Sequence, residues 1–157
     1  MRTDNRTIKN TVISIYFILV VFAILFATVF KSFGVFEGHS LYIFIALFLA
    51  VLVVHFIAKF FEYDSDGTNL IITNKGLILT DYVNYRQHKT EIDKQKVLDF
   101  KIHNYFFYKS LVVVRKSGDG GVVKEHFNIT LLKKKKIKYV RQSLKKVIKE
   151  NKKVKLG

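Results

Sequence analysis

The chain has 157 residues, of which 50% are apolar and 15% aromatic, and its formal net charge is +15. A single soluble core covered by so many Lys and Arg side chains would not need this many apolar residues. The apolar and basic residues must therefore occupy different segments. The chain has no cysteine, which excludes a disulfide framework, a thiolate zinc site and a cysteine nucleophile.

Two long apolar runs predict a helical hairpin in a membrane. Residues 11–30 contain no charge, Gly or Pro, and residues 41–58 are interrupted only by His55. As helices they would be about 30 and 27 Å long, close to the ~30 Å hydrocarbon core of a bilayer. We therefore expect transmembrane helices at 11–30 and 41–58, joined by an extracytoplasmic loop at 31–40.

The basic residues Arg2, Arg6 and Lys9 precede the first run and set the predicted orientation. A cleaved signal peptide is the alternative, but the run exceeds the usual apolar length of about 7 to 15 residues and no A-x-A-like site follows it. Positive charge beside membrane helices stays in the cytoplasm. We expect a multi-pass protein of the cell (inner) membrane, with residues 1–10 and the C-terminus both cytoplasmic.

Residues 59–68 are expected to be a linker between the membrane and the next domain. Their sequence EYDSDG resembles a calcium loop, since placing Gly67 at position six of an EF-hand puts acidic residues at positions one, three and five. Position twelve would then be Thr73, which lacks the bidentate carboxylate, and a strand-like pattern follows where a helix is required. We therefore expect a turn and no bound metal.

From Asn69 the apolar runs become short and alternate with polar residues, which is typical of β strands. We expect a hairpin of NLIIT and LILTD around the turn NKG, a strand at NYRQHKTEI and a half-buried strand at VLDFKIHNY. The clearest hairpin joins SLVVVRKS to VVKEHFNITL through the Gly-rich sequence GDGG. About six such strands would form a small antiparallel barrel or sandwich.

The segment at about 134–150 has the spacing of an amphipathic helix that closes this α+β domain. A narrow apolar stripe runs along an otherwise basic cylinder and consists of Ile137, Val140, Leu144, Val147 and Ile148. We expect the stripe to pack on the sheet, and residues 152–157 to form a basic tail.

The basic helix is the strongest electrostatic feature, because residues 131–157 contain twelve Lys or Arg and one acid. A cation held near an anionic leaflet gains on the order of 1 kcal/mol. We expect seven lysines to contact anionic lipid of the inner leaflet or an acidic protein partner, including a second copy: Lys133, Lys134, Lys135, Lys136, Lys145, Lys146 and Lys149. The alternatives are a helix whose stripe enters lipid and a helix that binds RNA. Nucleic acid is disfavoured because no aromatic RNP-like motif is present.

No catalytic motif is present: the chain lacks G-x-S-x-G, a Gly-rich loop between a strand and a helix, and a close Ser, His and Asp arrangement. His55 has no charged partner in either apolar run, which favours a headgroup position over a proton or ion pathway. His88, His103 and His126 lack the spacing of metal ligands. We expect no enzyme and no cofactor; an enzyme whose site combines several strands stays the alternative.

The order of elements resembles that of membrane-anchored bacterial pleckstrin-homology-like domain proteins. The resemblance covers Thr11 to about Asn151 and is carried by LIITNKGLIL, YRQHKTEIDKQKVLDFKIHN and YKSLVVVRKSG. The usual Arg after the Thr of the first strand motif is replaced, since Thr73 is followed by Asn74. The resemblance implies a cytoplasmic PH-like domain at 69–151 that acts as a noncatalytic interaction or scaffolding module, and some such proteins accompany bacteriocin self-immunity.

Overall fold

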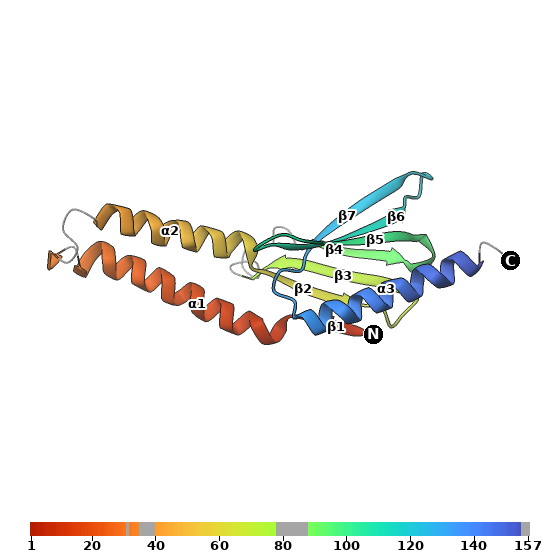
Figure 1. Ribbon diagram of the computed structural model, residues 1–157, viewed down its shortest axis with the longest axis horizontal. Helices are drawn as coiled ribbons and strands as arrows, with labels where there is room; N and C mark the ends of the chain where they lie inside the picture. Colours follow the sequence, from red (N-terminus) through yellow and green to blue (C-terminus); the bar gives the residue numbers. More distant parts are fainter. Residues whose placement is uncertain (31, 35–39, 78–87, 155–157) are drawn as a thin grey trace.

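The computed structural model describes residues 1–30, 32–34, 40–77 and 88–154 of the chain (Figure 1). An apolar helix pair lies at one end: α1 (Arg6–Leu25), continued by the π-helical turn η1 (Phe26–Phe30), runs beside α2 (Ser40–Ile57). Two β sheets and the long helix α3 (Lys134–Val154) form the other end. The predicted loop at 31–40 and the end of the predicted tail at 152–157 lie largely outside the described residues.

In the described part of the chain, seven strands form two sheets, and all neighbouring strands are antiparallel. One sheet has the order β1-β2-β3-β4 and the other the order β5-β6-β7. The strands are β1 (Arg2–Asp4), β2 (Lys59–Asp64), β3 (Asn69–Gly76), β4 (His88–Asp93), β5 (Val97–Asn104), β6 (Lys109–Lys116) and β7 (Val122–Asn128). A 3-10 turn, η2 (Lys94–Lys96), carries the chain from the first sheet to the second.

The predicted pair of transmembrane helices is wrong. Among the described residues, one helix is long and apolar enough to cross a membrane by length and composition, over the 24 residues Arg6–Val29. The apolar part of α2 is limited to Leu41–Ile57, and as a helix it is about 26 Å long, shorter than a ~30 Å hydrocarbon core. It ends there because Lys59 begins β2, and Ala58, which we had placed in the second span, is buried against the sheet domain.

The predicted closed, PH-like barrel is also wrong. Within the described ranges, no strand of the first sheet pairs with a strand of the second. Instead α3 lies against β5, η2 and β1, so a helix covers the core where a barrel would need strand pairing. The side-chain amide of Asn151 donates to the carbonyl oxygens of Lys94 (2.7 Å) and Val97 (2.9 Å), which fixes the end of α3 to the crossing between the sheets.

The apolar stripe of α3 packs on the sheets as the periodicity predicted. Val140, Leu144 and Val147 are buried in one core with residues of both sheets, and Ile137 and Ile148 pack at its edge. The helix begins at Lys134, close to the predicted residue, and continues beyond 150 to Val154.

Three differences from the predicted strands follow from long-range pairing. Lys59–Asp64, which we placed in a linker, is the inner strand β2. The NKG sequence is not a turn, because β3 continues through it and Gly76 pairs with Lys59. Most of the predicted strand LILTD and the first half of NYRQHKTEI lie outside the described residues. A bulge at the start of β5 puts Val97 in the core. The β6–β7 hairpin is confirmed, with Gly120 at a φ of 80° in its turn.

Buried asparagines join the sheets to each other and to the helix pair. The side-chain oxygen of Asn5 accepts a hydrogen bond from the backbone N–H of Phe61 at 3.0 Å. The Asn74 amide donates to the carbonyl oxygen of Asn128, and the Asn128 amide donates to that of Ile57, the last residue of α2, both at 3.0 Å. All three asparagines are buried. Because an unpaired buried amide is costly, these bonds hold the sheets and the end of α2 in one arrangement.

Candidate anionic-surface site

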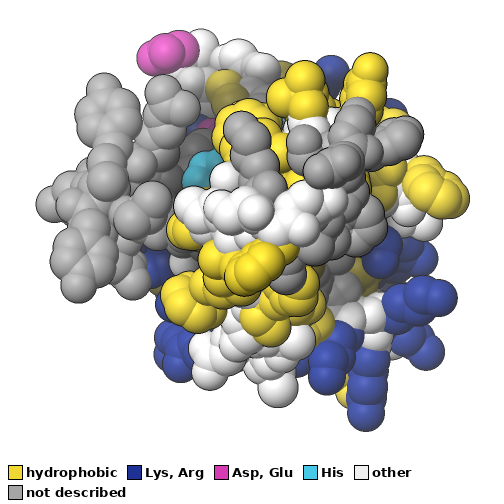
Figure 2. Space-filling model, turned by 90° about the vertical axis from the view of Figure 1, so that its left-hand side faces the viewer, with side chains coloured by type: hydrophobic (Ala, Val, Ile, Leu, Met, Phe, Trp, Pro, Cys, Tyr) yellow, Lys and Arg dark blue, Asp and Glu magenta, His cyan; other side chains and the backbone are white. Residues whose placement is uncertain are grey.

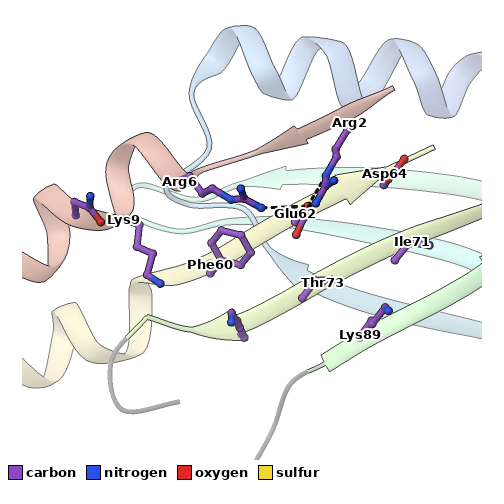
Figure 3. A pocket seen from close by; sticks show the side chains of 11 residues that line it. Arg2, Arg6, Lys9, Phe60, Glu62, Asp64, Ile71, Thr73 and Lys89 are labelled. Atoms are coloured by element: carbon purple, nitrogen blue, oxygen red, sulfur yellow. Dashed lines mark hydrogen bonds and ion pairs between the residues drawn. The ribbon is translucent and has the colours of Figure 1, made fainter. Parts of the chain in front are cut away.

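The first candidate surface is a polar pocket of about 680 Å³ at the base of α1 (Figure 3). Its floor is the exposed face of β2, β3 and β4, and the N-terminal segment forms one wall. The lining cations are Arg2, Arg6, Lys9, Lys75 and Lys89. Two acidic side chains of β2, Glu62 and Asp64, line the same pocket, so its charge is mixed.

Both arginines of this N-terminal pocket already have acidic partners. Arg2 Nε donates to a Glu62 carboxylate oxygen at 2.7 Å, and Arg6 Nη2 lies 3.8 Å from the same oxygen. Arg6 Nε is also 3.5 Å from a carboxylate oxygen of Asp4. The hydrogen bond and the negative charge of Glu62 raise the pKa of Arg2. These ion pairs hold the N-terminal segment on β2, and two of the five cations are therefore used within the protein.

The second candidate surface, which we call the α3 groove, is lined by cations of α3 and of the β5–β6 hairpin. It has a volume of about 550 Å³ and lies between α3 and the adjoining ends of β5 and β6. Its cations are Lys109, Lys134, Lys138, Arg141 and Lys145. Ile102 and Ile137 give it an apolar floor. Among the described residues, no carboxylate lines the groove or forms an ion pair with one of these five cations.

The seven lysines predicted to contact an anionic surface fall into three groups: two line the groove, three are exposed outside it and two have acidic partners. Lys134 and Lys145 line the groove, whereas Lys133, Lys135 and Lys149 are exposed outside it.

The other two predicted lysines have partners. Lys136 is half-buried and turns to β1, where its ammonium donates to the backbone carbonyl of Asp4 and lies 3.7 Å from the Asp4 carboxylate. Lys146 lies 3.9 Å from Glu150 on the exposed side of the helix.

Three groove cations were missed by the sequence interpretation. Lys138 and Arg141 follow Lys134 by four and seven residues and precede Lys145, a spacing that puts all four on one helix face. That signal was present in the sequence. Lys109 could not be found from helical spacing, because it reaches the groove from the β5–β6 hairpin.

The start of α3 lies close to the apolar helix pair. Leu131, just before α3, packs against a small cluster at the base of the pair that includes Val12 of α1 and Ala58 after α2. From there α3 runs away from the pair (Figure 1). Figure 2 looks onto the end formed by the helix pair and shows Lys and Arg side chains gathered mostly on one side of the apolar helices. The contact of Leu131 therefore places the start of the basic helix beside the base of the apolar pair.

Only the second half of the EYDSDG segment is a turn, because its first three residues end β2, and a lysine holds the backbone of this β2–β3 turn. Lys94 Nζ donates to the carbonyl oxygen of Ser65 at 2.8 Å and also to that of Gly67. Asp64 accepts a hydrogen bond from the backbone N–H of Asp66 at 2.9 Å, which closes a local Asx turn. Within the described ranges, no three His, Asp or Glu residues are arranged to hold a metal ion.

The chain was also compared with known proteins. No family model, curated protein or solved structure matches it. The two basic surfaces, and their position beside the apolar helices, are therefore the observations from which a function can be inferred.

Proposed function

We propose that this chain is a noncatalytic, membrane-associated binding module that holds its basic sheet domain against an anionic membrane surface. The observation that carries the proposal is the α3 groove, in which five of the described cations converge and no described carboxylate lines the site. Phosphate-bearing lipid headgroups supply the missing negative charge. The described lining contains amides and aliphatic groups besides these cations, and no Ser, His, Asp or Glu, which favours binding over catalysis.

The candidate span supplies the attachment. α1 has the length and composition to enter a bilayer, and its base is packed against the sheet domain through Val12. A cation close to an anionic leaflet gains on the order of 1 kcal/mol, and the gain fades beyond about 8 Å at physiological salt. The cations at the start of α3 are therefore expected to contribute more than those at its far end.

The orientation follows from β1. Arg2 pairs with Asp64 across β1 and β2, so the residues before α1 and those after α2 belong to one sheet and lie on one side of the helix pair. Basic residues next to a membrane helix remain in the cytoplasm. As part of the same proposal, we assign both termini and the sheet domain to the cytoplasmic face of a cell membrane, with α1 and the shorter α2 entering the bilayer together from that face.

The test uses the full chain in proteoliposomes of phosphatidylcholine, alone or mixed with phosphatidylglycerol. A fluorophore on Gln142→Cys in the groove reports contact with lipids that carry a headgroup quencher, and labelling is specific because the chain has no cysteine. We expect stronger quenching in the anionic vesicles and loss of the difference at high salt. Equal quenching in both vesicles would contradict the proposal.

Two double variants with the same change of charge show whether the groove itself is used. Lys134→Gln with Lys138→Gln removes two groove cations, whereas Lys152→Gln with Lys153→Gln removes two exposed cations at the far end of α3. We expect only the first pair to reduce quenching in anionic vesicles. An equal effect of both pairs would mean that total charge, and not the groove, drives the contact. Displacement of the lipid by single-stranded RNA would point to nucleic acid as the partner.

A further inference from the structure

The turn between β5 and β6 exposes aromatic side chains to an unusual degree. Phe106 is 103% exposed, Phe107 is 68% exposed and Tyr105 is 58% exposed. The backbone N–H of Tyr105 donates to the carbonyl oxygen of Tyr108 at 2.8 Å, so the two phenylalanines occupy the tip of a tight hairpin. Such tips usually carry Gly, Asn or Asp, which suit their backbone. Two apolar rings at this position therefore need a reason other than turn formation.

The exposed rings do not cover each other. The Phe106 and Phe107 rings are 6.4 Å apart and nearly perpendicular, at 87°, which leaves their outer faces open. Tyr105 and Tyr108 stack behind them at 6.2 Å and form the base of the tip. A contiguous exposed apolar tip with a polar aromatic base is typical of a surface that contacts a partner or a membrane.

The tip lies at the end of the second sheet that adjoins the helix pair. Ser110 of β6 pairs with Asn128 of β7, and the Asn128 side chain is bonded to Ile57, the last residue of α2. The turn at 105–108 is therefore close to the base of the helix pair, as Figure 1 also shows. The β6–β7 turn around Gly120 is at the opposite end of the sheet.

We propose that Phe106 and Phe107 insert into the interfacial layer of the membrane as a second attachment point of the sheet domain. The inference rests on the proposed membrane association of α1. Tyr is enriched at the membrane–water interface, and Phe is common on the apolar faces of interfacial segments. Lys109, directly after the tip, lines the α3 groove, where it can contact lipid phosphate. Two attachment points would fix the tilt of the sheet domain and keep the groove facing the headgroups.

The test uses tryptophan, because the chain has none. Single variants of the full chain are placed in vesicles of phosphatidylcholine and phosphatidylglycerol, with or without bromine on the acyl chains. We expect the emission of Phe106→Trp to shift to the blue on reconstitution and to lose much of its intensity with brominated lipid. Val122→Trp, at the far end of the sheet, should show neither change.

A third variant separates the two proposals. Phe22→Trp lies on α1 and should be quenched if that helix enters the bilayer. Quenching of Phe22→Trp without quenching of Phe106→Trp would overturn the second attachment point and leave the membrane association intact. Absence of quenching in both would overturn both proposals. A blue shift of Phe106→Trp without quenching by brominated lipid would mean that a protein, or a second copy of this chain, covers the tip, and would also overturn the inference.

Discussion

The N-terminal pocket and the α3 groove are each lined by five of the described cations, but they differ in the negative charge beside them. In the pocket, Glu62 of β2 bonds Arg2 and lies within ion-pair distance of Arg6. In the groove, the described lining contains no carboxylate. Counting Lys and Arg would rank the two surfaces equally. Pairing shows that the pocket uses part of its charge to hold the N-terminal segment, whereas the described residues offer no carboxylate partner to the groove cations.

The two surfaces are connected through β2. Glu62 points into the pocket, and its neighbour Tyr63 points to the opposite face, where its hydroxyl donates to Ser143 Oγ of α3 at 2.9 Å. One strand therefore holds the N-terminal segment on one face and the groove-forming helix on the other. Variants on β2 and α3 can change one surface without removing the other.

The largest expected effect comes from the buried face of α3. Leu144→Asp would place a carboxylate at a fully buried core position, and we expect a loss of roughly 4 to 5 kcal/mol or more in the free energy of unfolding. Urea denaturation of the full chain in detergent micelles, followed by circular dichroism, measures it. Gln142→Asp introduces the same charge on the exposed groove face and should cost about 1 kcal/mol or less. Equal stability of the two variants would show that α3 does not use this stripe in the core.

A smaller effect is expected at Tyr63, which ties β2 to α3. Tyr63→Phe removes the hydroxyl bond to Ser143, and we expect a loss of about 0.5 to 1.5 kcal/mol in the free energy of unfolding at neutral pH. Burial raises the pKa of Tyr63 above its ordinary value.

Because the pKa of Tyr63 is raised in the folded state, its contribution to the free energy of unfolding depends on pH. A folded-state pKa above the unfolded one means that the stabilisation is complete below about pH 10 and is lost as the pH rises through the folded-state value. The difference between the wild type and Tyr63→Phe should therefore shrink above about pH 10. Denaturant titrations at neutral and alkaline pH measure this difference, and a constant difference would contradict the burial of the ionisable hydroxyl.

The smallest effect is expected when the N-terminal pocket loses a carboxylate and so becomes more like the α3 groove in charge. Glu62→Gln removes the carboxylate that Arg2 and Arg6 share, so the pocket should gain a modest attraction for anionic lipid. A fluorophore on Asn10→Cys, which lines the pocket, measures headgroup contact in vesicles with phosphatidylglycerol. Glu150→Gln makes the same change of charge on α3, away from the pocket, and serves as the control. An equal response to both variants would mean that the ion pairs of Glu62 are not the reason for weak lipid contact at the pocket.

Local patterns were sufficient for several elements. The β6–β7 hairpin follows from period-two alternation on both sides of a Gly-rich turn, and the buried stripe of α3 follows from spacings of three and four residues. The apolar composition of α1 likewise identified a candidate span. Four of the five groove cations lie on one face of α3 and could have been found from their spacing.

Tertiary structure decided the rest, because it brings together residues that lie far apart in the sequence. Lys59–Asp64 became an inner strand by pairing with β1 and β3, and the second apolar helix therefore ends at Ile57 and not at Ala58. Lys109 completes the groove from another hairpin. Asn5 is polar and near the N-terminus, yet it is buried because it bonds Phe61, 56 residues away. A periodic pattern predicts which face of an element is apolar, but the partner of that face depends on long-range packing that no local pattern records.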